Sequence, residues 1–148
     1  MNTPVAGVGA ETERAIDLVR TGPSRYTARN ARGTSLTIGD GSSDDFTPVE
    51  LLLVALAGCT SITVDPLVSR RAEATSFKVH ARADKVRDPD LGSVLKDILL
   101  TFNVDYGGSE EALTALADGL KAAEDRLCTV SRTVAVGTQT EWEINTSS

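Results

Sequence analysis

The apolar and polar residues alternate at two different spacings along the chain, and together these predict strands and helices. Residues 15–36 alternate in short runs that are separated by turn sequences at residues 21–24 and 32–33, so we expect a β-hairpin or meander there. A short helix over residues 11–19 is the alternative for the first part of this segment. The polar run at residues 39–45 is typical of a loop.

The clearest helix start in the sequence follows this loop. Thr47 can cap a helix that has Pro48 at its first position and Glu50 at its third, which is a capping box. Residues 51–64 are apolar nearly all round, so we expect a helix that is buried on every side, until Pro66 kinks or ends it. A short chain has limited means to surround such a helix, which indicates that a second subunit covers part of it.

The rest of the chain predicts two strands, a helix and a last strand. Residues 77–84 alternate as in a half-solvated strand, and a second strand is expected over Ser93–Asp105. Ser109 can cap a helix whose apolar stripe runs from Leu113 to Leu127. We expect the last strand over Arg132–Ile144. This order of elements predicts an α+β fold.

Length and charge limit the classes of function. With 148 residues, of which 41% are hydrophobic and 24% charged, the chain predicts one soluble domain over residues 13–148 after a flexible N-terminus at residues 1–12. The net charge of -6 argues against nucleic acid and against a membrane surface as partners. The N-terminus lacks a signal-peptide pattern, and the apolar run at 51–64 is too short for a membrane anchor, so a cytoplasmic protein is expected.

Two cysteines are the candidates for chemistry. Cys59 falls inside the apolar helix, and Cys128 falls at the end of the next helix. Either one alone could be a small core residue, because free cysteine is among the most buried residue types. Together they could act as a thiolate and a resolving thiol that reduce an O–O bond through a sulfenic acid. Two cysteines and the single His80, without close spacing, are too few ligands for a zinc site, so no metal is expected.

Two segments of the chain resemble the OsmC/Ohr family. Residues 47–64, TPVELLLVALAGCTSITV, look like the signature helix of that family, and residues 127–133, LCTVSRT, look like its second cysteine segment. The order of elements from about residue 15 to 145 is similar as well. The resemblance implies an OsmC-like fold, in which antiparallel sheets wrap around long central helices in an intertwined homodimer with active sites at the subunit interface.

The resemblance also implies a reaction. Typical members are thiol-dependent enzymes that reduce hydroperoxides, often organic ones, to alcohols. They use no metal and no organic cofactor, and they draw electrons from a dithiol such as dihydrolipoamide. On this basis Cys59 is the nucleophile that attacks the peroxide, and Cys128 is the resolving thiol that closes a disulfide.

The thiolate needs a stabilising neighbour. A thiol with a pKa of about 8.5 is mostly protonated at neutral pH, and Cys59 lies too far along its helix for that helix's dipole to help. In peroxidases of the family an Arg and a Glu complete the site. Arg32 is the first choice here, with Arg29 and Arg25 as alternatives, although each could be a solvated strand charge. Glu50 is the candidate acid, but nine residues before the cysteine it falls on the opposite helix face, and capping already gives it a structural role.

Two positions depart from the family's peroxidases. Val49 stands where those proteins carry the Glu, and Thr129 stands where they often carry Pro. Both differences resemble more divergent branches of the family. They favour a second hypothesis, a stress-associated or small-ligand-binding protein without efficient peroxidase activity. A third hypothesis is a redox-inert structural domain, in which Cys59 would not react with a thiol reagent.

Overall fold

The computed structural model describes residues 13–147 and shows an α+β fold, as the sequence predicts. The expected flexible segment at residues 1–12 lies outside the described residues. The chain falls into two compact units, the first ending at Glu50 and the second beginning at Leu51. The first unit holds a small sheet, and the second holds a long hairpin and most of the helical residues.

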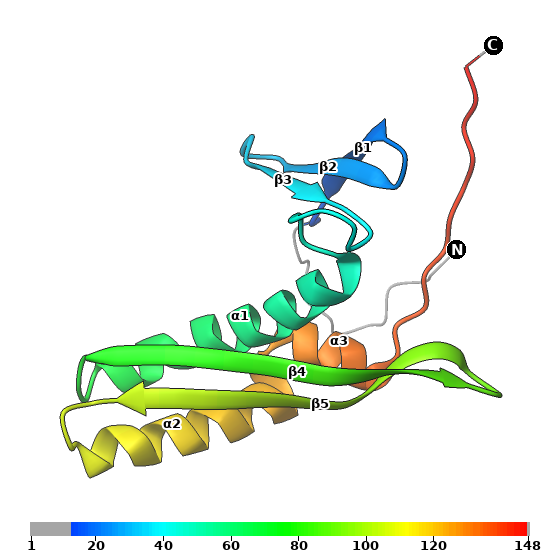
Figure 1. Cartoon of the computed structure of the whole chain (residues 1–148). Coiled ribbons are helices and arrows are strands. Elements are labelled where there is room, and N and C mark those ends of the chain that lie inside the picture. The colour runs from blue at the N-terminus through cyan, green and yellow to red at the C-terminus, as the bar shows by residue number, and fades with distance from the viewer. Residues whose placement is uncertain (1–12, 148) are drawn as a thin grey trace, which may run out of the picture. The chain divides into compact units, whose positions relative to one another are not determined.

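The first unit is built around an antiparallel meander (Figure 1). Strands β1 (Ile16–Gly22), β2 (Arg25–Asn30) and β3 (Ser35–Ile38) pair in the order β1-β2-β3. Gly33, in the turn between β2 and β3, has a φ of 94°, a conformation that side chains other than glycine rarely adopt. The meander prediction is therefore confirmed, and the alternative of a helix is wrong for residues 13–19.

Helix α1 (Pro48–Ser69) begins with the predicted capping box. The backbone N–H of Thr47 donates to Oε1 of Glu50 at 3.0 Å, and the N–H of Glu50 donates to Oγ1 of Thr47 at 3.3 Å. The two side chains thereby satisfy N–H groups that have no partner within the helix.

Helix α1 continues past Pro66 to Ser69, so the expectation that it ends at Pro66 is wrong, whereas a kink there stays a prediction. Proline inside a helix removes one backbone hydrogen bond and costs about 3 kcal/mol. Val64 and Val68, on either side of Pro66 in the sequence, are fully buried in the core. Their burial offsets the cost and keeps the last turn helical.

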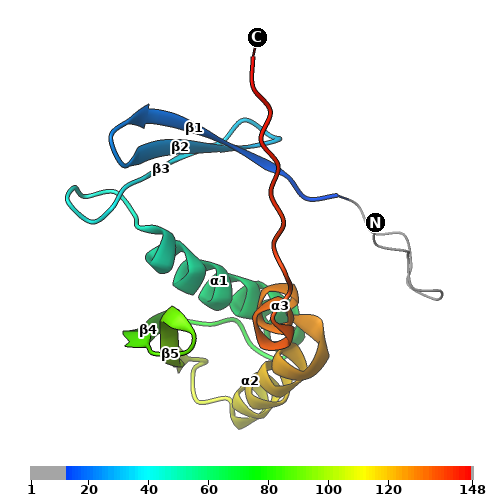
Figure 2. The same ribbon diagram turned by 90° about the vertical axis from the view of Figure 1, so that its right-hand side faces the viewer.

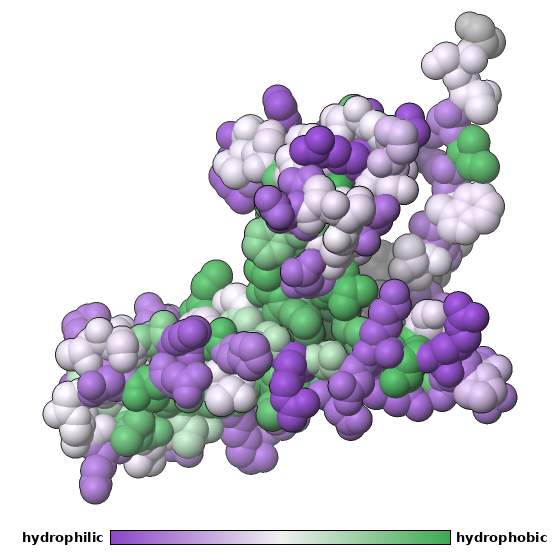
Figure 3. All heavy atoms as spheres, in the orientation of Figure 1, coloured by the Kyte–Doolittle hydropathy of each residue, from purple (hydrophilic) through white to green (hydrophobic). Residues whose placement is uncertain are grey.

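Only one stripe of α1 is buried within this chain, which corrects the expectation of burial on every side. Its buried residues follow a spacing of four and are Leu56, Thr60, Val64 and Val68. Ile62, by contrast, is 76% exposed, and Figure 3 shows apolar side chains gathered over α1. By length and composition alone the helix could cross a membrane, but its buried stripe packs within the core of the second unit, so we interpret it as a core helix.

Strands β4 (Ser76–Asp88) and β5 (Gly92–Asp105) form the long antiparallel hairpin of the second unit. The register shifts between Arg82 and Asp84, where β5 carries one extra residue. Asp97 lies at this bulge with a φ of 54°. In Figure 2 the hairpin is seen nearly end on, with α1 and α2 beside it.

The C-terminal part of the chain is helical up to residue 136, which corrects the prediction of a last strand over Arg132–Ile144. Helix α2 (Glu110–Ala122) continues into a π-helical turn, η1 (Ala123–Leu127). Helix α3 (Thr129–Val136) follows after Cys128. Beyond Gly137, the part of the chain that the structure describes has no regular secondary structure.

Two caps account for this difference. Cys128 adopts an extended conformation and its sulfur accepts the N–H of Ser131, which starts α3. Gly137, with a φ of 64°, ends the helix in a left-handed conformation. The β-branched residues between them, such as Val134, favour a strand only weakly, and the caps override that preference.

The core of the second unit lies where α1 crosses α2. A Cβ atom at Gly119 would come within 3.3 Å of Cγ1 of Val64, so the two helices approach closely because position 119 has no side chain. Phe77 and Phe102 pack edge to face from the hairpin, with ring centroids 5.9 Å apart. The buried cluster consists of Val64, Val68, Tyr106, Ala112, Leu116, Ala123 and Cys128.

Candidate active site

The structure brings Cys59 and Cys128 together in the second unit. Cys59 lies on α1 and packs against the buried cluster that contains Cys128. The two thiols influence each other's pKa, and neither forms a disulfide. Cys128 is fully buried, whereas Cys59 is half-buried. Two thiols that are far apart in the sequence are therefore brought together, one half-buried and one buried.

The turn between α2 and α3 places Cys128 at this position. The π-helical turn η1 changes the helical phase at the end of α2, and such turns are frequent at functional sites. The N–H of Cys128 donates to the carbonyl oxygen of Ala123 at 2.9 Å, which closes this turn. The chain then becomes extended for one residue, and α3 begins.

The first turn of α3 directs its N–H groups at the two sulfurs. The N–H of Ser131 donates to Sγ of Cys128 at 3.4 Å. The N–H groups of Thr129 and Val130 interact with the Cys59 sulfur. Helix N-termini carry unsatisfied donors and a partial positive charge, so they stabilise an anion. The favourable helix dipole at this site therefore comes from α3 rather than from α1.

Cys128 is the more acidic of the two thiols. Burial by itself raises its pKa, but hydrogen bonds from Ser131, Cys59 and Thr60 outweigh burial and lower the pKa of Cys128 to about 7. A hydrogen bond that is made to the charged form favours that form. A large share of Cys128 is therefore thiolate at neutral pH.

The pKa of Cys59 is shifted in the opposite direction. Burial raises the pKa of Cys59, and so do the hydrogen bond to Cys128 and the negative charge on it. The N–H groups of Val130 and Thr129 oppose this rise without cancelling it. The pair thus carries its negative charge on Cys128, which the resemblance had marked as the resolving thiol.

The other sequence-predicted site residues belong to the first unit. Arg32 is exposed in the turn between β2 and β3, where its N–H donates to Oδ1 of Asn30 at 3.0 Å. Arg25 forms an ion pair with Asp45, with Nε 3.3 Å from Oδ2, and Arg29 is exposed on β2. The catalytic role of Arg32 stays a prediction.

The Glu50 side chain caps the start of α1. Hydrogen bonds from the side chain and backbone of Thr47 lower the pKa of Glu50 below its ordinary value. These bonds confirm the capping role that the sequence suggests. Its role in catalysis stays a prediction.

Sequence reasoning missed two polar residues of the site. Thr60 and Ser131 both lie within hydrogen-bond reach of the Cys128 sulfur, Thr60 through Oγ1 at 3.7 Å. Ser131 follows Cys128 by three residues, which is the spacing of a helix N-cap and its bonded N–H. That spacing is the signal that could have identified α3 and Ser131 from the sequence.

A cavity of about 540 Å³ adjoins the thiol pair. Thr60 and Ser131, which contact Cys128, also line this cavity. The bulge at Asp97 breaks the alternation of β5, and three consecutive residues that follow it line one wall. The full lining is Leu56, Thr60, Ile98, Leu99, Leu100, Phe102, Leu120, Glu124, Ser131, Arg132, Val134 and Ala135.

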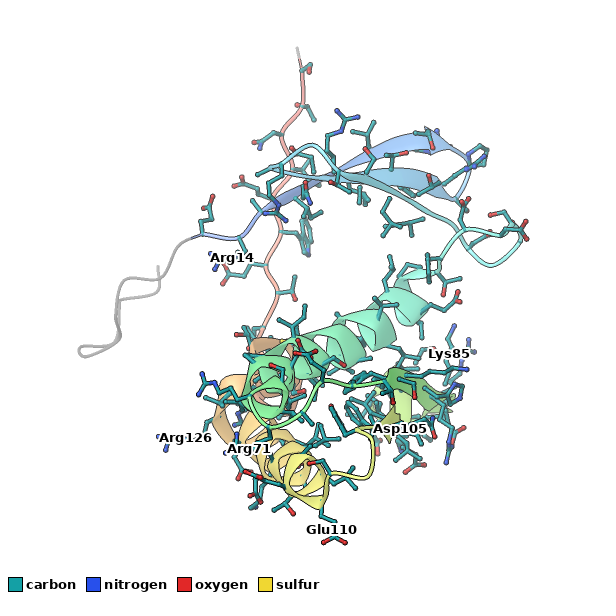
Figure 4. All side chains as sticks on the ribbon, turned by 90° about the vertical axis from the view of Figure 1, so that its left-hand side faces the viewer. Arg14, Arg71, Lys85, Asp105, Glu110 and Arg126 are labelled. Carbon is teal, nitrogen blue, oxygen red and sulfur yellow. The ribbon has the colours of Figure 1, made fainter. Side chains whose placement is uncertain are left out.

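Charged side chains of this unit lie mostly at its surface. Figure 4 shows Glu110 and Arg126 pointing away from the helices that carry them, and both are exposed. Arg132, on the cavity wall, donates from Nη1 to the carbonyl oxygen of Glu124 at 3.3 Å.

Within residues 13–147, no group of three or more His, Cys, Asp or Glu residues could hold a metal ion.

The chain belongs to the OsmC-like protein family. The sequence model of that family matches residues 39–143, which include both cysteines and span both compact units. An uncharacterized protein of Mycobacterium tuberculosis is 33% identical over 130 residues, which cover 84% of this chain and 91% of that protein.

Solved structures show the same fold. An OsmC-like protein from Mycoplasma pneumoniae superposes with a TM-score of 0.70 at 19% identity, over 85% of this chain and 89% of the other. A structure described as an organic hydroperoxide resistance protein, from Elizabethkingia anophelis, superposes with a TM-score of 0.59 at 16% identity, over 84% of this chain and 91% of the other. At these identities the likeness establishes the architecture.

Proposed function

We propose that this protein is a cytoplasmic, thiol-dependent peroxidase that reduces organic hydroperoxides to alcohols. The observation that carries the proposal is that Cys59 packs against the buried cluster containing Cys128, which caps the N-terminus of α3. Membership of the OsmC-like family supports it. So does the fold that the chain shares with a protein named for organic hydroperoxide resistance.

The two cysteines divide the reaction according to their burial. Cys59 is half-buried, so it is the sulfur that a hydroperoxide can reach, whereas Cys128 is fully buried. Attack by Cys59 on the O–O bond releases the alcohol and leaves a sulfenic acid on Cys59. Cys128 then displaces the oxygen to form the Cys59–Cys128 disulfide, and an external dithiol reduces that disulfide by thiol exchange.

The adjoining cavity fits the apolar part of such a substrate. Most of its lining is aliphatic or aromatic, from α1, β5, α2 and α3. Pockets for small organic ligands are typically apolar with a few polar groups that fix orientation. Thr60 and Ser131 line this cavity and also contact the sulfur of Cys128, so the cavity lies next to the residues that surround the thiol pair.

We propose Arg32 and Glu50 for the roles that an Arg and a Glu fill in the family's peroxidases, although Val49 stands at the family's Glu position. Arg32 is the better candidate than Arg25, because Asp45 already pairs with the Arg25 guanidinium. Arg32 would place a positive charge beside the reacting oxygens. Glu50 remains in the proposal as the candidate acid one residue later, although both Thr47 hydrogen bonds occupy its Oε1.

A second copy of the chain is part of the proposal. Val54 and Ile62 of α1 are 51% and 76% exposed, which leaves an apolar face of the central helix open to a partner. The segment after Gly137 exposes Trp142 and Ile144, which alternate with acidic residues as in a strand that lacks a neighbour. We therefore propose a homodimer, for which light scattering at micromolar concentration should give twice the mass of the chain.

Peroxide consumption tests the proposed reaction. The purified protein is mixed with cumene hydroperoxide and dihydrolipoamide, and loss of the hydroperoxide is followed. We expect turnover that Cys59→Ser abolishes, while the matched variant Ser61→Ala, which removes a hydroxyl from the same helix, retains it. Turnover in Cys59→Ser equal to that of the wild type would refute the proposal.

Binding of a small apolar ligand is the second candidate function. The cavity of about 540 Å³ favours it, because its size and lining fit a drug-sized apolar molecule. Under this alternative the protein would bind such a ligand without reducing hydroperoxide at a useful rate. Slow, non-saturable peroxide loss together with saturable binding of an apolar fluorescent probe would favour it over the peroxidase.

A further inference from the structure

We propose that the cavity of the second unit binds organic carboxylates, and that Arg132 is the residue that recognises their carboxylate group. The ligand class is an aromatic or aliphatic body that carries one carboxylate. This inference rests on the use of the cavity as a ligand site, which is proposed above, and it goes beyond that use by naming the charge of the ligand. It does not depend on the reduction of a peroxide.

The cavity has the size and the lining of a site for a small organic molecule. Its volume of about 540 Å³ is typical of ligand pockets. Residues 98–100 of β5 line it on one element, and Val134 and Ala135 of α3 line it on another. All residues of the lining lie in the second unit. These side chains favour the burial of an apolar body, whatever its charge.

Arg132 adds a guanidinium to this largely apolar lining. Helix α3 presents residues 131, 132, 134 and 135 to the cavity, and these positions share one side of a helix. Arg132 is half-buried, and its Nη1 donates to the carbonyl oxygen of Glu124 at 3.3 Å. This bond ties the guanidinium to η1 beside the cavity.

The guanidinium keeps donors for a ligand. Of its five N–H groups, one makes the bond to Glu124, and this is the one hydrogen bond of the Arg132 side chain among residues 13–147. No ion pair within the same residues involves Arg132. A carboxylate can accept two parallel hydrogen bonds from the planar fork of a guanidinium. A bound carboxylate would therefore pair a cation that has no anionic partner in the described part of the chain.

The charges around the cavity favour an anion over a cation. Among the described residues of the lining, Glu124 and Arg132 are charged, and the Glu124 carboxylate would attract a cation. Glu124 is exposed, however, so water and salt screen its charge. The Arg132 guanidinium is half-buried and tethered, so it is the fixed charge of the cavity. The net charge of -6 disfavours anions elsewhere on the chain, so the attraction is local to this guanidinium.

The apolar and charged parts of the cavity define the ligand class together. An inorganic anion can pair with the guanidinium, but it leaves the apolar lining in contact with water. A neutral apolar molecule covers the lining, but it takes the guanidinium out of water without supplying an acceptor, which costs free energy. A molecule with both parts covers the apolar lining and satisfies the N–H groups of Arg132.

A titration with three probes of nearly equal size tests this inference. The probes para-isopropylbenzoate, para-isopropylbenzamide and para-isopropylbenzylamine carry a negative charge, no charge and a positive charge at neutral pH on the same apolar body. Backbone NMR shifts of the purified protein give the Kd of each probe and show where it binds. Signals of cavity residues such as Ile98 and Val134 should move.

We expect the wild type to bind the benzoate about tenfold more tightly than the benzamide, because hydrogen bonds to charged groups are the stronger ones. The benzylamine should bind most weakly. Arg132→Gln should bring the benzoate and the benzamide to within about twofold of each other and leave the Kd of the benzamide unchanged. Arg132→Lys keeps the charge but loses the planar fork, so it should retain part of the preference.

Arg126→Gln is the matched control. Arg126 is exposed on η1 and points away from the helices (Figure 4), and its substitution changes the net charge by the same amount. This variant should keep the full preference for the benzoate. A loss equal to that in Arg132→Gln would attribute the preference to overall charge and overturn the role of Arg132.

Three further results would overturn the inference. Equal affinity of the wild type for the benzoate and the benzamide would exclude recognition of a carboxylate and leave the cavity as an apolar site. Tightest binding of the benzylamine would assign the charge preference to Glu124. Absence of saturable binding for every probe would refute the ligand site as well, while the peroxidase is judged separately by peroxide consumption. The wild-type comparison needs no variant, so it decides even where Arg132→Gln fails to fold.

Discussion

The hydroxyl oxygen of Thr60 lies 3.7 Å from the sulfur of Cys128, a residue 68 positions further along the chain. Both atoms are buried, and the contact joins α1 to the start of α3. It links the helix that carries Cys59 to the cap that carries Cys128. Packing of these two helices therefore determines the acidity of the site.

Removal of the Thr60 hydroxyl should make Cys128 less acidic. We expect Thr60→Val to raise the midpoint of the thiolate titration by about half a pH unit, because one of the hydrogen bonds that favour the thiolate is lost. Thr63→Val is the matched control, since its hydroxyl bonds the Cys59 carbonyl on the same helix. An equal shift in both variants would show that the change is not specific to the Thr60–Cys128 contact.

The stability of the protein should depend on pH through Cys128. Its pKa is lowered to about 7 in the folded state from an ordinary value of 9.0, so its contribution to stability is fully present above the unfolded pKa and is lost as the pH falls through about 7. We expect the free energy of unfolding to rise by about 1–3 kcal/mol between these limits. The raised pKa of Cys59 opposes any further rise in the free energy of unfolding above these pH limits.

Urea denaturation at a series of pH values measures this dependence. The difference in slope between the wild type and Cys128→Ser isolates the contribution of Cys128, whatever the variant does to stability as a whole. An identical slope in both proteins would contradict the assignment of a charged Cys128.

The capping box should contribute to stability. Substitutions at Thr47 and Glu50 measure this structural contribution separately from any role of Glu50 in catalysis. Thr47→Ala should lower the free energy of unfolding by about 1 kcal/mol, because Glu50 loses its capping partner. Glu50→Gln keeps an acceptor for the Thr47 N–H, so it should cost less. Thermal denaturation measures both variants, and a larger loss in Glu50→Gln than in Thr47→Ala would contradict the capping account.

The lowered pKa of Glu50 should make the free energy of unfolding depend on pH in the acid range. Because its folded pKa is depressed, its stabilising effect is present above the unfolded value and is lost as the pH falls through the folded value.

Peroxidase activity of Glu50→Gln at neutral pH decides whether Glu50 has a catalytic role. A small change in rate would leave Glu50 a capping residue, and a large one would make it part of the site.

Arg32 should be the arginine on which peroxide reduction depends. We expect Arg32→Gln to lower kcat/KM for cumene hydroperoxide by about tenfold or more, because a positive charge near the departing oxygen favours the transition state. Arg25→Gln removes a guanidinium that is already paired with Asp45, and we expect a smaller loss. Equal activity in the wild type and Arg32→Gln would exclude Arg32 from the site.

Much of the fold could be predicted from local patterns. The meander, the capped start of α1, the long hairpin and α2 follow from alternation, turn residues and caps, which act over a few residues. The prediction from the sequence failed at α3, where β-branched residues suggest a strand but the caps at Cys128 and Gly137 impose a helix. It also misplaced the end of α1, which continues past Pro66 because core burial beyond the local sequence keeps the chain helical there.

The candidate site could be predicted only in part. The two cysteine segments point to a redox pair through their resemblance to a family, but no spacing rule says that Cys59 and Cys128 meet. The reversed order of their pKa values depends on Ser131, Thr60 and the N-terminus of α3. The Thr60 contact and the approach of α3 to Cys59 arise from tertiary packing, so they could not be derived from the linear sequence, whereas the Ser131 cap is local.

The most direct test of the account is the mass of the protein and of its proteolytic peptides after one equivalent of cumene hydroperoxide, without reductant. We predict that the chain loses two hydrogen atoms and that one peptide pair contains Cys59 joined to Cys128. A protein that keeps both thiols free, or that accumulates sulfinic acid on Cys59 while Cys128 stays reduced, would show that the two cysteines do not work as one redox pair.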